Sequence, residues 1–226
     1  QTEIDWQERK RLLKVAFPMD IHANEASYEI QFGAIQRPTH WSSSWDWAKF
    51  EVCAQRWADL SEGDYGVSLL NDCKYGYDTK DGVMRLTLLR GPMTPDSQAD
   101  LGRHTLTYSL FPHLGDWAEG GTPRTAAELN QPLLAMEAVP HDGAETPSGL
   151  VSVNRDNVVV DTIKKAEDRD ELVVRLYENA NRRGPLTLSF DRPLASAAIL
   201  DLLENVEQQL EPQGKAVSLQ IKPYEI

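Results

Sequence analysis

The stretch Thr105-Leu106-Thr107-Tyr108-Ser109-Leu110 alternates polar and apolar residues, and this alternation decides the fold. Successive side chains of a β-strand point to opposite faces, so a period of two is typical of a strand with one buried face. The same period recurs along the whole chain, at Tyr28, Ile30 and Phe32, at Met84, Leu86 and Leu88, at Leu186, Leu188 and Phe190, and at Val217, Leu219 and Ile221. The sequence therefore predicts an all-β fold.

Short turn signals separate these runs. They are Glu62-Gly63-Asp64, Lys80-Asp81-Gly82 and Arg183-Gly184-Pro185, which offer residues that accept positive φ or preset a bend. Turns this short join antiparallel neighbours, and no repeat of fixed period indicates a propeller or solenoid. We expect one large antiparallel β-sandwich that spans residues 1–226.

Three segments depart from the strand pattern. Thr125 and Glu128 have capping-box spacing ahead of Leu129, with Pro132 beyond, which predicts one short helix. The stretch from Ile199 to Leu210 has mixed spacing, and both a strand with a loop and a strand with a short helix fit it. Residues 138–149 are rich in Pro, Gly, Asp and Glu and are expected to form a surface loop.

The charge and the cysteines restrict the partners and the compartment. The formal net charge of -12 argues against nucleic acid, whose phosphates reward clustered Lys and Arg. No apolar run reaches the roughly 18 residues of a membrane span, and residues 1–10 lack the apolar core of a signal peptide. With only Cys53 and Cys73 and no Asn-x-Ser/Thr site, the expected location is a reducing cytoplasm.

The residues alone assign no catalytic or metal-binding site. The histidines occur singly, without His-x-His, His-x-Asp or His-Glu-x-x-His, at His22, His40, His104, His113 and His141. No Gly-x-Ser-x-Gly elbow or phosphate-binding glycine loop is present. The acidic cluster Asp59, Glu62, Asp64, Asp72 and Asp78 is interpreted as solvated turn residues, because sequence spacing does not place two carboxylates in one cleft.

Two segments gather aromatic and hydrogen-bonding side chains without strand periodicity. One is Arg37-Pro38-Thr39-His40-Trp41 with Trp45-Asp46-Trp47, and the other is Asn71-Asp72-Cys73-Lys74-Tyr75-Gly76-Tyr77-Asp78. Such composition is typical both of sugar-contacting loops and of aromatic packing at strand ends.

At these segments the chain resembles the C-terminal β region of the glycoside hydrolase family 38 α-mannosidases, closest to their cytosolic and bacterial branch. The resemblance runs almost end to end in order and spacing. Its motifs are Leu13-Lys14-Val15-Ala16-Phe17-Pro18, Arg37-Pro38-Thr39-His40, Ala48-Lys49-Phe50-Glu51-Val52, Arg56-Trp57-Ala58-Asp59-Leu60-Ser61, Leu69-Leu70-Asn71-Asp72-Cys73-Lys74-Tyr75-Gly76-Tyr77, Phe111-Pro112-His113, Leu176-Tyr177-Glu178 and Lys222-Pro223-Tyr224-Glu225-Ile226.

The resemblance implies a retaining glycosidase that removes terminal α-linked mannose with an Asp nucleophile, an Asp acid/base and a zinc ion. In the family these groups precede the β region, and the His-x-Asp zinc signature has no counterpart between Gln1 and Ile226. The resemblance thus implies a mutarotase-like supersandwich without a cofactor of its own and inactive alone. We expect it to be part of a longer chain, to pack against the catalytic domain and to complete the mannoside pocket.

The resemblance also suggests roles for particular residues. Lys74 is the positional equivalent of a basic residue that related mannosidases place near the substrate, and Asp72 lies in the same loop. Tyr75 and Tyr77 are candidates to supply apolar faces for a sugar ring. The expected interface with the missing domains contains Arg37, His40 and Trp45.

Two alternatives stay open. The sandwich could bind carbohydrate independently through its tryptophans, namely Trp41, Trp45, Trp47, Trp57 and Trp117. It could also be a self-sufficient enzyme with an unrecognised carboxylate pair. A mannoside titration tests the first alternative and an activity assay tests the second.

Overall fold

The computed structural model describes residues 1–137 and 149–226, which form two compact units. Unit 1 covers Gln1–Leu134 and unit 2 covers Ala135–Ile226. The predicted surface loop at 138–149 and His141 lie outside the described residues, apart from residue 149. Strands dominate both units and every strand pairing among the described residues is antiparallel, which confirms the all-β antiparallel fold class. Each of the two units has its own apolar cluster.

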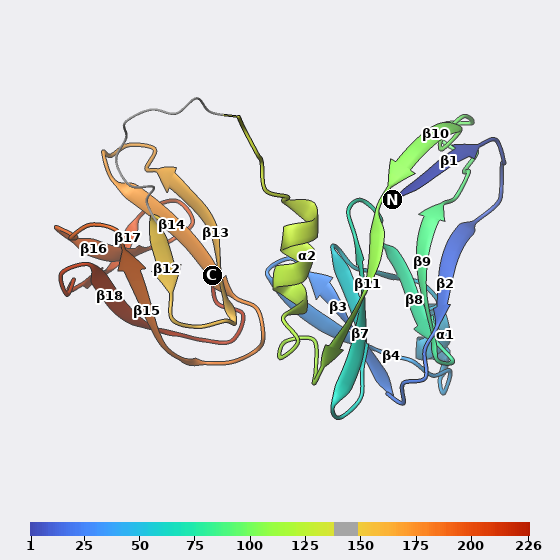
Figure 1. Ribbon diagram of the computed structural model, residues 1–226, viewed down its shortest axis with the longest axis horizontal. Coiled ribbons are helices and arrows are strands. Elements are labelled where there is room, and N and C mark those ends of the chain that lie inside the picture. Colours follow the sequence, from blue (N-terminus) through green and yellow to red (C-terminus); the bar gives the residue numbers. More distant parts are fainter. Residues whose placement is uncertain (138–148) are drawn as a thin grey trace. The chain divides into compact units, whose positions relative to one another are not determined.

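Unit 1 contains two facing sheets and a separate two-stranded pair (Figure 1). One sheet has the order β11-β7-β6-β3-β4, the second has the order β2-β9-β8-β5, and β1 pairs with β10. The strands are β1 (Thr2–Trp6), β2 (Leu13–Pro18), β3 (Glu25–Ile30), β4 (Gly33–Pro38), β5 (Val52–Cys53), β6 (Trp57–Ser61), β7 (Tyr65–Asn71), β8 (Gly76–Lys80), β9 (Val83–Leu89), β10 (Gly102–Leu106) and β11 (Tyr108–Leu114).

The core of unit 1 is formed by the alternate residues that face the space between the two sheets. Tyr28 and Leu69 come from the five-stranded sheet, and Tyr77 and Leu86 come from the four-stranded sheet. All four are at most 1% exposed. Burying each such side chain contributes about 1.5–3 kcal/mol, so this cluster is a principal source of the stability of unit 1.

The hairpin between β8 and β9 follows the turn chemistry predicted at Lys80-Asp81-Gly82. Asp81 and Gly82 both have positive φ, 54° and 70°. Two central residues with positive φ give a turn whose twist matches the flanking strands, and Asp-Gly is a preferred pair for it. Local sequence therefore sets the register of this hairpin.

A helix is present where the sequence predicted one, but its start was predicted wrongly. Helix α2 (Thr122–Asn130) begins three residues before Thr125, after the left-handed residue Gly121 and without a side-chain cap. Pro123 presets the helical φ of the first turn, and Thr125 donates from Oγ1 to the Gly121 carbonyl instead of capping. Helix α2 covers the outer face of the five-stranded sheet, against β7 and β6 (Figure 1).

A second helix, α1 (Ser44–Ala48), was not predicted. Ser43 caps it by accepting a hydrogen bond from the Asp46 N–H, and the Ser43 hydroxyl donates to Asp46 Oδ2 at 2.9 Å. Five residues are too few to display a helical apolar period, so the segment looked irregular in sequence.

Unit 2 contains a three-stranded sheet, β12-β15-β18, and two hairpins, β13-β14 and β16-β17. Its core includes Val158, Leu186, Leu188, Val217 and Ile221. The stretch from Ile199 to Leu210, for which the sequence fitted two interpretations, belongs to the β16-β17 hairpin and contains no helix. A register shift between Ile199 and Leu200 interrupts its strand alternation. The strands are β12 (Val151–Val153), β13 (Val158–Lys165), β14 (Leu172–Glu178), β15 (Gly184–Phe190), β16 (Ala197–Leu200), β17 (Val206–Leu210) and β18 (Ala216–Ile221).

The last residues of the chain are attached to unit 2 by a buried carboxylate. Glu178 is 0% exposed and accepts hydrogen bonds from Asn157 Nδ2 at 2.6 Å, from the Ala180 N–H at 2.8 Å and from the Tyr224 N–H at 3.0 Å. Burying a carboxylate is tolerable only when several donors satisfy it. Strand β18 ends at Ile221, and the residues that follow it form a turn on this carboxylate rather than continuing the strand.

Candidate functional site

Residues 71–78 link the five-stranded sheet to the four-stranded sheet, and Asn71 organises this connection. Its Oδ1 accepts hydrogen bonds from the backbone N–H groups of Cys73, at 3.0 Å, and of Lys74. Its Nδ2 donates to the Gln55 carbonyl at 3.0 Å and to the Tyr77 hydroxyl. Asn71 itself is 1% exposed. The loop after β7 is therefore built around one buried amide.

Asp72 has a structural role in the same loop. Its Oδ2 accepts a hydrogen bond from the Thr107 N–H at 2.9 Å. Burial opposes ionisation, but hydrogen bonds from the Cys73 thiol and from Thr107 outweigh it, and the pKa of Asp72 is lowered. Burial and the neighbouring Asp72 raise the pKa of Cys73 to about 11, so its thiol stays protonated near neutral pH.

Lys74 and Tyr75 follow Cys73 in the loop, and Lys74 is half-buried while Tyr75 is exposed. Tyr75 is 58% exposed. Within residues 1–137 and 149–226 the Lys74 ammonium takes part in none of the ion pairs, all of which involve other residues. An ammonium group is suited to donate to sugar hydroxyl groups, and an exposed aromatic ring is suited to cover the apolar face of a sugar.

The placement of Tyr77 contradicts its expected contact with sugar. Its ring is 1% exposed and packs edge-to-face against Tyr28, with centroids 6.3 Å apart. Burial raises the pKa of its hydroxyl well above the ordinary value. Tyr77 lies at an inward position of β8, so it has no free face to offer and instead accepts the Asn71 hydrogen bond.

The second candidate segment surrounds α1. His40 Nδ1 lies 2.8 Å from Ser42 Oγ and 3.7 Å from Asp46 Oδ2, while Arg37 at the end of β4 is half-buried. Three large apolar side chains within six residues are exposed, Trp45 at 75%, Trp47 at 62% and Phe50 at 66%. The sequence predicted Trp45 as part of an interface, whereas Phe50 was only one residue of a family motif.

Lys80 attaches this segment to the four-stranded sheet. It is 4% exposed, and its Nζ donates to the carbonyls of Pro38 at 2.6 Å and His40 at 3.3 Å. The same ammonium lies 4.5 Å from the centroid of the Trp41 ring, which packs against Trp47. Burial lowers the pKa of Lys80 because it disfavours the charged form. The sequence marked Lys80 only as part of a turn signal, which gave no indication of these contacts.

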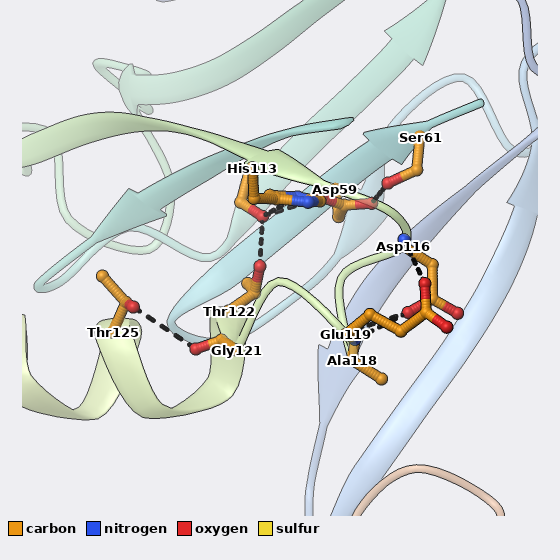
Figure 2. A network of polar contacts seen from close by, with 10 residues as sticks. Asp59, Ser61, His113, Asp116, Ala118, Glu119, Gly121, Thr122 and Thr125 are labelled. Atoms are coloured by element: carbon orange, nitrogen blue, oxygen red, sulfur yellow. Dashed lines mark hydrogen bonds and ion pairs between the residues drawn. The ribbon is translucent and has the colours of Figure 1, made fainter. Parts of the chain in front are cut away.

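A buried Ser, His and Asp cluster lies between the five-stranded sheet and the start of α2 (Figure 2). His113 Nε2 contacts both Asp59 Oδ2, at 2.7 Å, and Ser68 Oγ, at 3.2 Å. In nucleophilic catalysis the imidazole uses one nitrogen for the serine and the other for the carboxylate, so this geometry does not fit. Ser68 is also 0% exposed and Thr122 Oγ1 lies 2.6 Å from its hydroxyl. The cluster joins α2 to the sheet.

Other carboxylates of the acidic cluster also have structural partners. Asp78 contacts Lys14 Nζ at 2.6 Å and Arg85 Nη1 at 2.7 Å, and Glu62 accepts from the His22 N–H at 2.8 Å. Their interpretation as solvated turn residues is therefore wrong for Asp59 and Asp78, which are 1% and 8% exposed. Strands β6 and β8 place these side chains where partners from distant segments meet them.

The described residues also limit the kinds of site that this part of the chain can form. Within residues 1–137 and 149–226 no group of three or more His, Cys, Asp or Glu side chains is arranged to hold a metal ion. None of the described helices combines the length and apolar character that crossing a membrane requires.

Comparison with known proteins adds independent information. Residues 1–98 match the model of the glycosyl hydrolases family 38 C-terminal domain, and residues 157–226 match the family 38 C-terminal beta sandwich domain. The human protein alpha-mannosidase 2C1 is 43% identical over 230 residues, which cover 100% of this chain and 22% of that protein. The alpha-mannosidase of Saccharomyces cerevisiae is 40% identical over 88% of this chain and 20% of its own length.

The fold is also found in a solved structure. The crystal structure of an alpha-mannosidase from Enterococcus faecalis aligns with a TM-score of 0.82 at 21% identity, over 99% of this chain and 26% of that chain. The chain thus spans about a fifth to a quarter of the length of the relatives it matches. From the two family models and the similarity to relatives along the whole chain, it follows that the chain belongs to the C-terminal domains of glycosyl hydrolase family 38.

Proposed function

We propose that this chain is the noncatalytic C-terminal part of a retaining α-mannosidase that hydrolyses terminal α-linked mannose. The observation that carries the proposal is the loop at 71–78, in which a buried Asn71 fixes the backbone, Tyr75 is exposed, and the half-buried Lys74 forms no ion pair with the described residues. The relatives are named alpha-mannosidases and extend well beyond the matched region. Lys74 donates to mannoside hydroxyls and Tyr75 packs against the sugar ring, which completes a pocket whose catalytic carboxylates and zinc belong to the rest of the enzyme.

The surface around α1 is the proposed contact with the rest of the enzyme. Arg37, His40 and Trp45 form it together with Trp47 and Phe50, which the structure leaves exposed. Interface cores are enriched in aromatic residues and arginine, and monomeric proteins rarely expose many large apolar side chains in one segment. We also propose a cytoplasmic location, supported by the free thiols of Cys53 and Cys73.

Independent carbohydrate binding is the second candidate function, and the structure reduces the number of tryptophans that are candidates to contact a sugar. Trp57 is 1% exposed and packs against Trp117, with centroids 4.9 Å apart, beneath α2. Only Trp41, Trp45 and Trp47 of the five tryptophans remain candidates for a sugar platform. Titration of this chain with mannosides tests it, because an accessory domain alone is expected to give no saturable binding.

The first test is hydrolysis of a chromogenic aryl α-mannoside by this chain alone, with and without added zinc, beside an intact family 38 enzyme. We expect no turnover from a chain whose folding is verified by circular dichroism. Reproducible turnover would overturn the noncatalytic assignment, because the reacting groups would then lie within residues 1–226.

The second test concerns Lys74 in a full-length α-mannosidase that contains this sequence. Lys74→Ala is expected to lower kcat/KM at least about tenfold, as the loss of a hydrogen bond from a charged donor would. The matched control is Lys165→Ala, which removes a 71% exposed lysine side chain from β13 in unit 2. Unchanged kinetics for Lys74→Ala would reject the substrate contact while leaving the family assignment intact.

A further inference from the structure

The peptide unit between Asn71 and Asp72 is held from both sides by segments outside the loop. The Asn71 carbonyl accepts a hydrogen bond of 3.0 Å from Nδ2 of Asn130, a residue 59 positions later in the sequence. The Asp72 N–H donates to the carbonyl of Thr107 at 3.2 Å. Because the carbonyl and the N–H of one peptide unit lie in one plane, these two bonds fix the orientation in which the chain leaves β7.

The Asn130 side chain fits this role only as an amide donor. Its Nδ2 also donates to the Ala126 carbonyl at 2.9 Å, one turn earlier on α2. Two carbonyl oxygens thus face one nitrogen, and the NH₂ group has one hydrogen for each. A carboxylate of the same shape would place an oxygen against both carbonyls and lose both bonds.

Helix α2 is itself fixed to the strand that leads into the loop. At its first turn Thr122 Oγ1 lies 2.6 Å from Ser68 Oγ, and further along Ala126 packs with Leu70. Ser68, Leu70 and Asn71 are all in β7. The helix therefore lies along β7, and Asn130, its last residue, lies at the end of that strand. Contacts at both ends of the helix fix its position on β7.

We infer that Asn130 is a positioning residue for the substrate loop: it holds the Asn71 backbone, and Asn71 in turn holds the Lys74 N–H. The chain of contacts is Asn130 Nδ2 to the Asn71 carbonyl, then Asn71 Oδ1 to the backbone N–H of Lys74. Without Asn130 the ammonium of Lys74 samples positions away from the mannoside. This inference rests on the proposed contact between Lys74 and substrate.

The kinetic test is a double-mutant cycle in the full-length α-mannosidase that contains this sequence. Asn130→Asp and Asn130→Ala are each expected to lower kcat/KM for an aryl α-mannoside by about threefold to tenfold, as the loss of one neutral hydrogen bond would. In a Lys74→Ala background the Asn130 changes should have almost no further effect, because the group they position is gone. Glu128→Gln, on the exposed side of α2, is the control and should match wild type.

The second readout does not depend on activity. The N–H groups of Cys73 and Lys74 are expected to exchange with solvent at least about tenfold faster in Asn130→Asp than in wild-type chain, and not in Glu128→Gln. Unchanged exchange, or a multiplicative loss of kcat/KM in the double mutant, would overturn the positioning role. If Lys74→Ala itself has wild-type kinetics, the substrate contact fails instead, and the exchange experiment still decides whether Asn130 orders the loop.

Discussion

His113 Nε2 lies 2.7 Å from Asp59 Oδ2, and the two side chains are 2% and 1% exposed. Strand β11 carries the histidine and β6 the carboxylate, with β7 between them in the sheet. Ser68 on β7 contacts both side chains, and Thr122 extends the network to α2. This cluster is the polar end of the contact between α2 and the sheet (Figure 2).

The His113 cluster is expected to make stability depend on pH. Burial by itself lowers the pKa of His113, but the hydrogen bond and charge of Asp59 outweigh it, so the pKa is raised above the usual 6.5. A raised folded-state pKa contributes stability that is fully present below pH 6.5 and is lost as pH rises through the folded-state pKa. Urea unfolding of the chain at several pH values should show this loss. It should be absent in His113→Gln and retained in the control His22→Gln, which changes an exposed histidine.

Removing His113 altogether is expected to be costly. His113→Ala removes the imidazole partner of the buried Asp59 and leaves it only the hydroxyl donors of Ser61 and Ser68. Breaking a buried pair on one side costs about 3–5 kcal/mol in free energy of unfolding. Equilibrium denaturation measures this cost. A loss similar to that of the exposed His22→Ala would contradict the structural role assigned to the cluster.

Two glycines form a cradle for the imidazole ring. A Cβ atom at Gly66 would overlap Ser61 Oγ and His113 Cε1, and one at Gly120 would overlap His113 Cγ and Nδ1. Overpacking of a filled site costs about 1–3 kcal/mol, so Gly66→Ala and Gly120→Ala should lower the free energy of unfolding by that amount. The matched control is Gly63→Ala, because a Cβ there meets nothing within 4 Å. Equal stability of all three variants in urea would refute the cradle.

Glu178 is expected to hold the end of the chain on unit 2. Glu178→Gln replaces one of the two acceptor oxygens by an NH₂ donor. At the position of Oε1 this donor would face Asn157 Nδ2 and the Ala180 N–H, and at the position of Oε2 it would face the Tyr224 N–H. A buried polar group left without its partner costs about 1–3 kcal/mol. Amide exchange at Tyr224 should accelerate, whereas Glu207→Gln, at an exposed strand position, should leave it unchanged.

The exposed aromatic residues around α1 should affect association rather than folding. Replacing Trp45 and Phe50 by Ser in this chain removes apolar surface from water without removing core contacts, since both side chains are more than 60% exposed. The melting temperature is expected to stay the same, and self-association seen by light scattering at high concentration should fall. In the full-length enzyme the same changes should weaken the attachment of this region, which limited proteolysis would detect. A drop in the melting temperature of the chain alone would place these residues in its own core instead.

Local sequence was sufficient for much of the strand layout. The alternation at Leu106, Tyr108 and Leu110 predicted a half-buried strand; the segment is extended, but it divides at Thr107 between β10 and β11, which belong to different sheets. Asp81-Gly82 fixed a hairpin because the conformations it needs depend on two adjacent residues alone. The order of the motifs along the chain indicated the family, because a family resemblance depends on residue identities and not on knowledge of which residues are in contact.

The candidate site was only partly accessible in this way. The sequence selected the loop at 71–78 and, within it, Lys74 and Tyr75, but it treated Tyr77 as equivalent to Tyr75. Residues two apart on a strand share a face, whereas Tyr75 precedes β8 and Tyr77 lies within it with its ring turned into the core. The difference depends on where β8 begins, and the residue types alone do not show that position.

By itself the sequence determined the all-β class, the main strands, the hairpin at Asp81-Gly82 and the family, because each depends on residues adjacent in the chain or on their order. The tertiary structure alone decided the burial of Tyr77, the contact of His113 with Asp59 and the hydrogen bond from Asn130 to Asn71. The last pair is 59 positions apart and the His113–Asp59 pair is 54 apart. Contacts over such separations form only when sheets and helix pack, so no local pattern of residues encodes them.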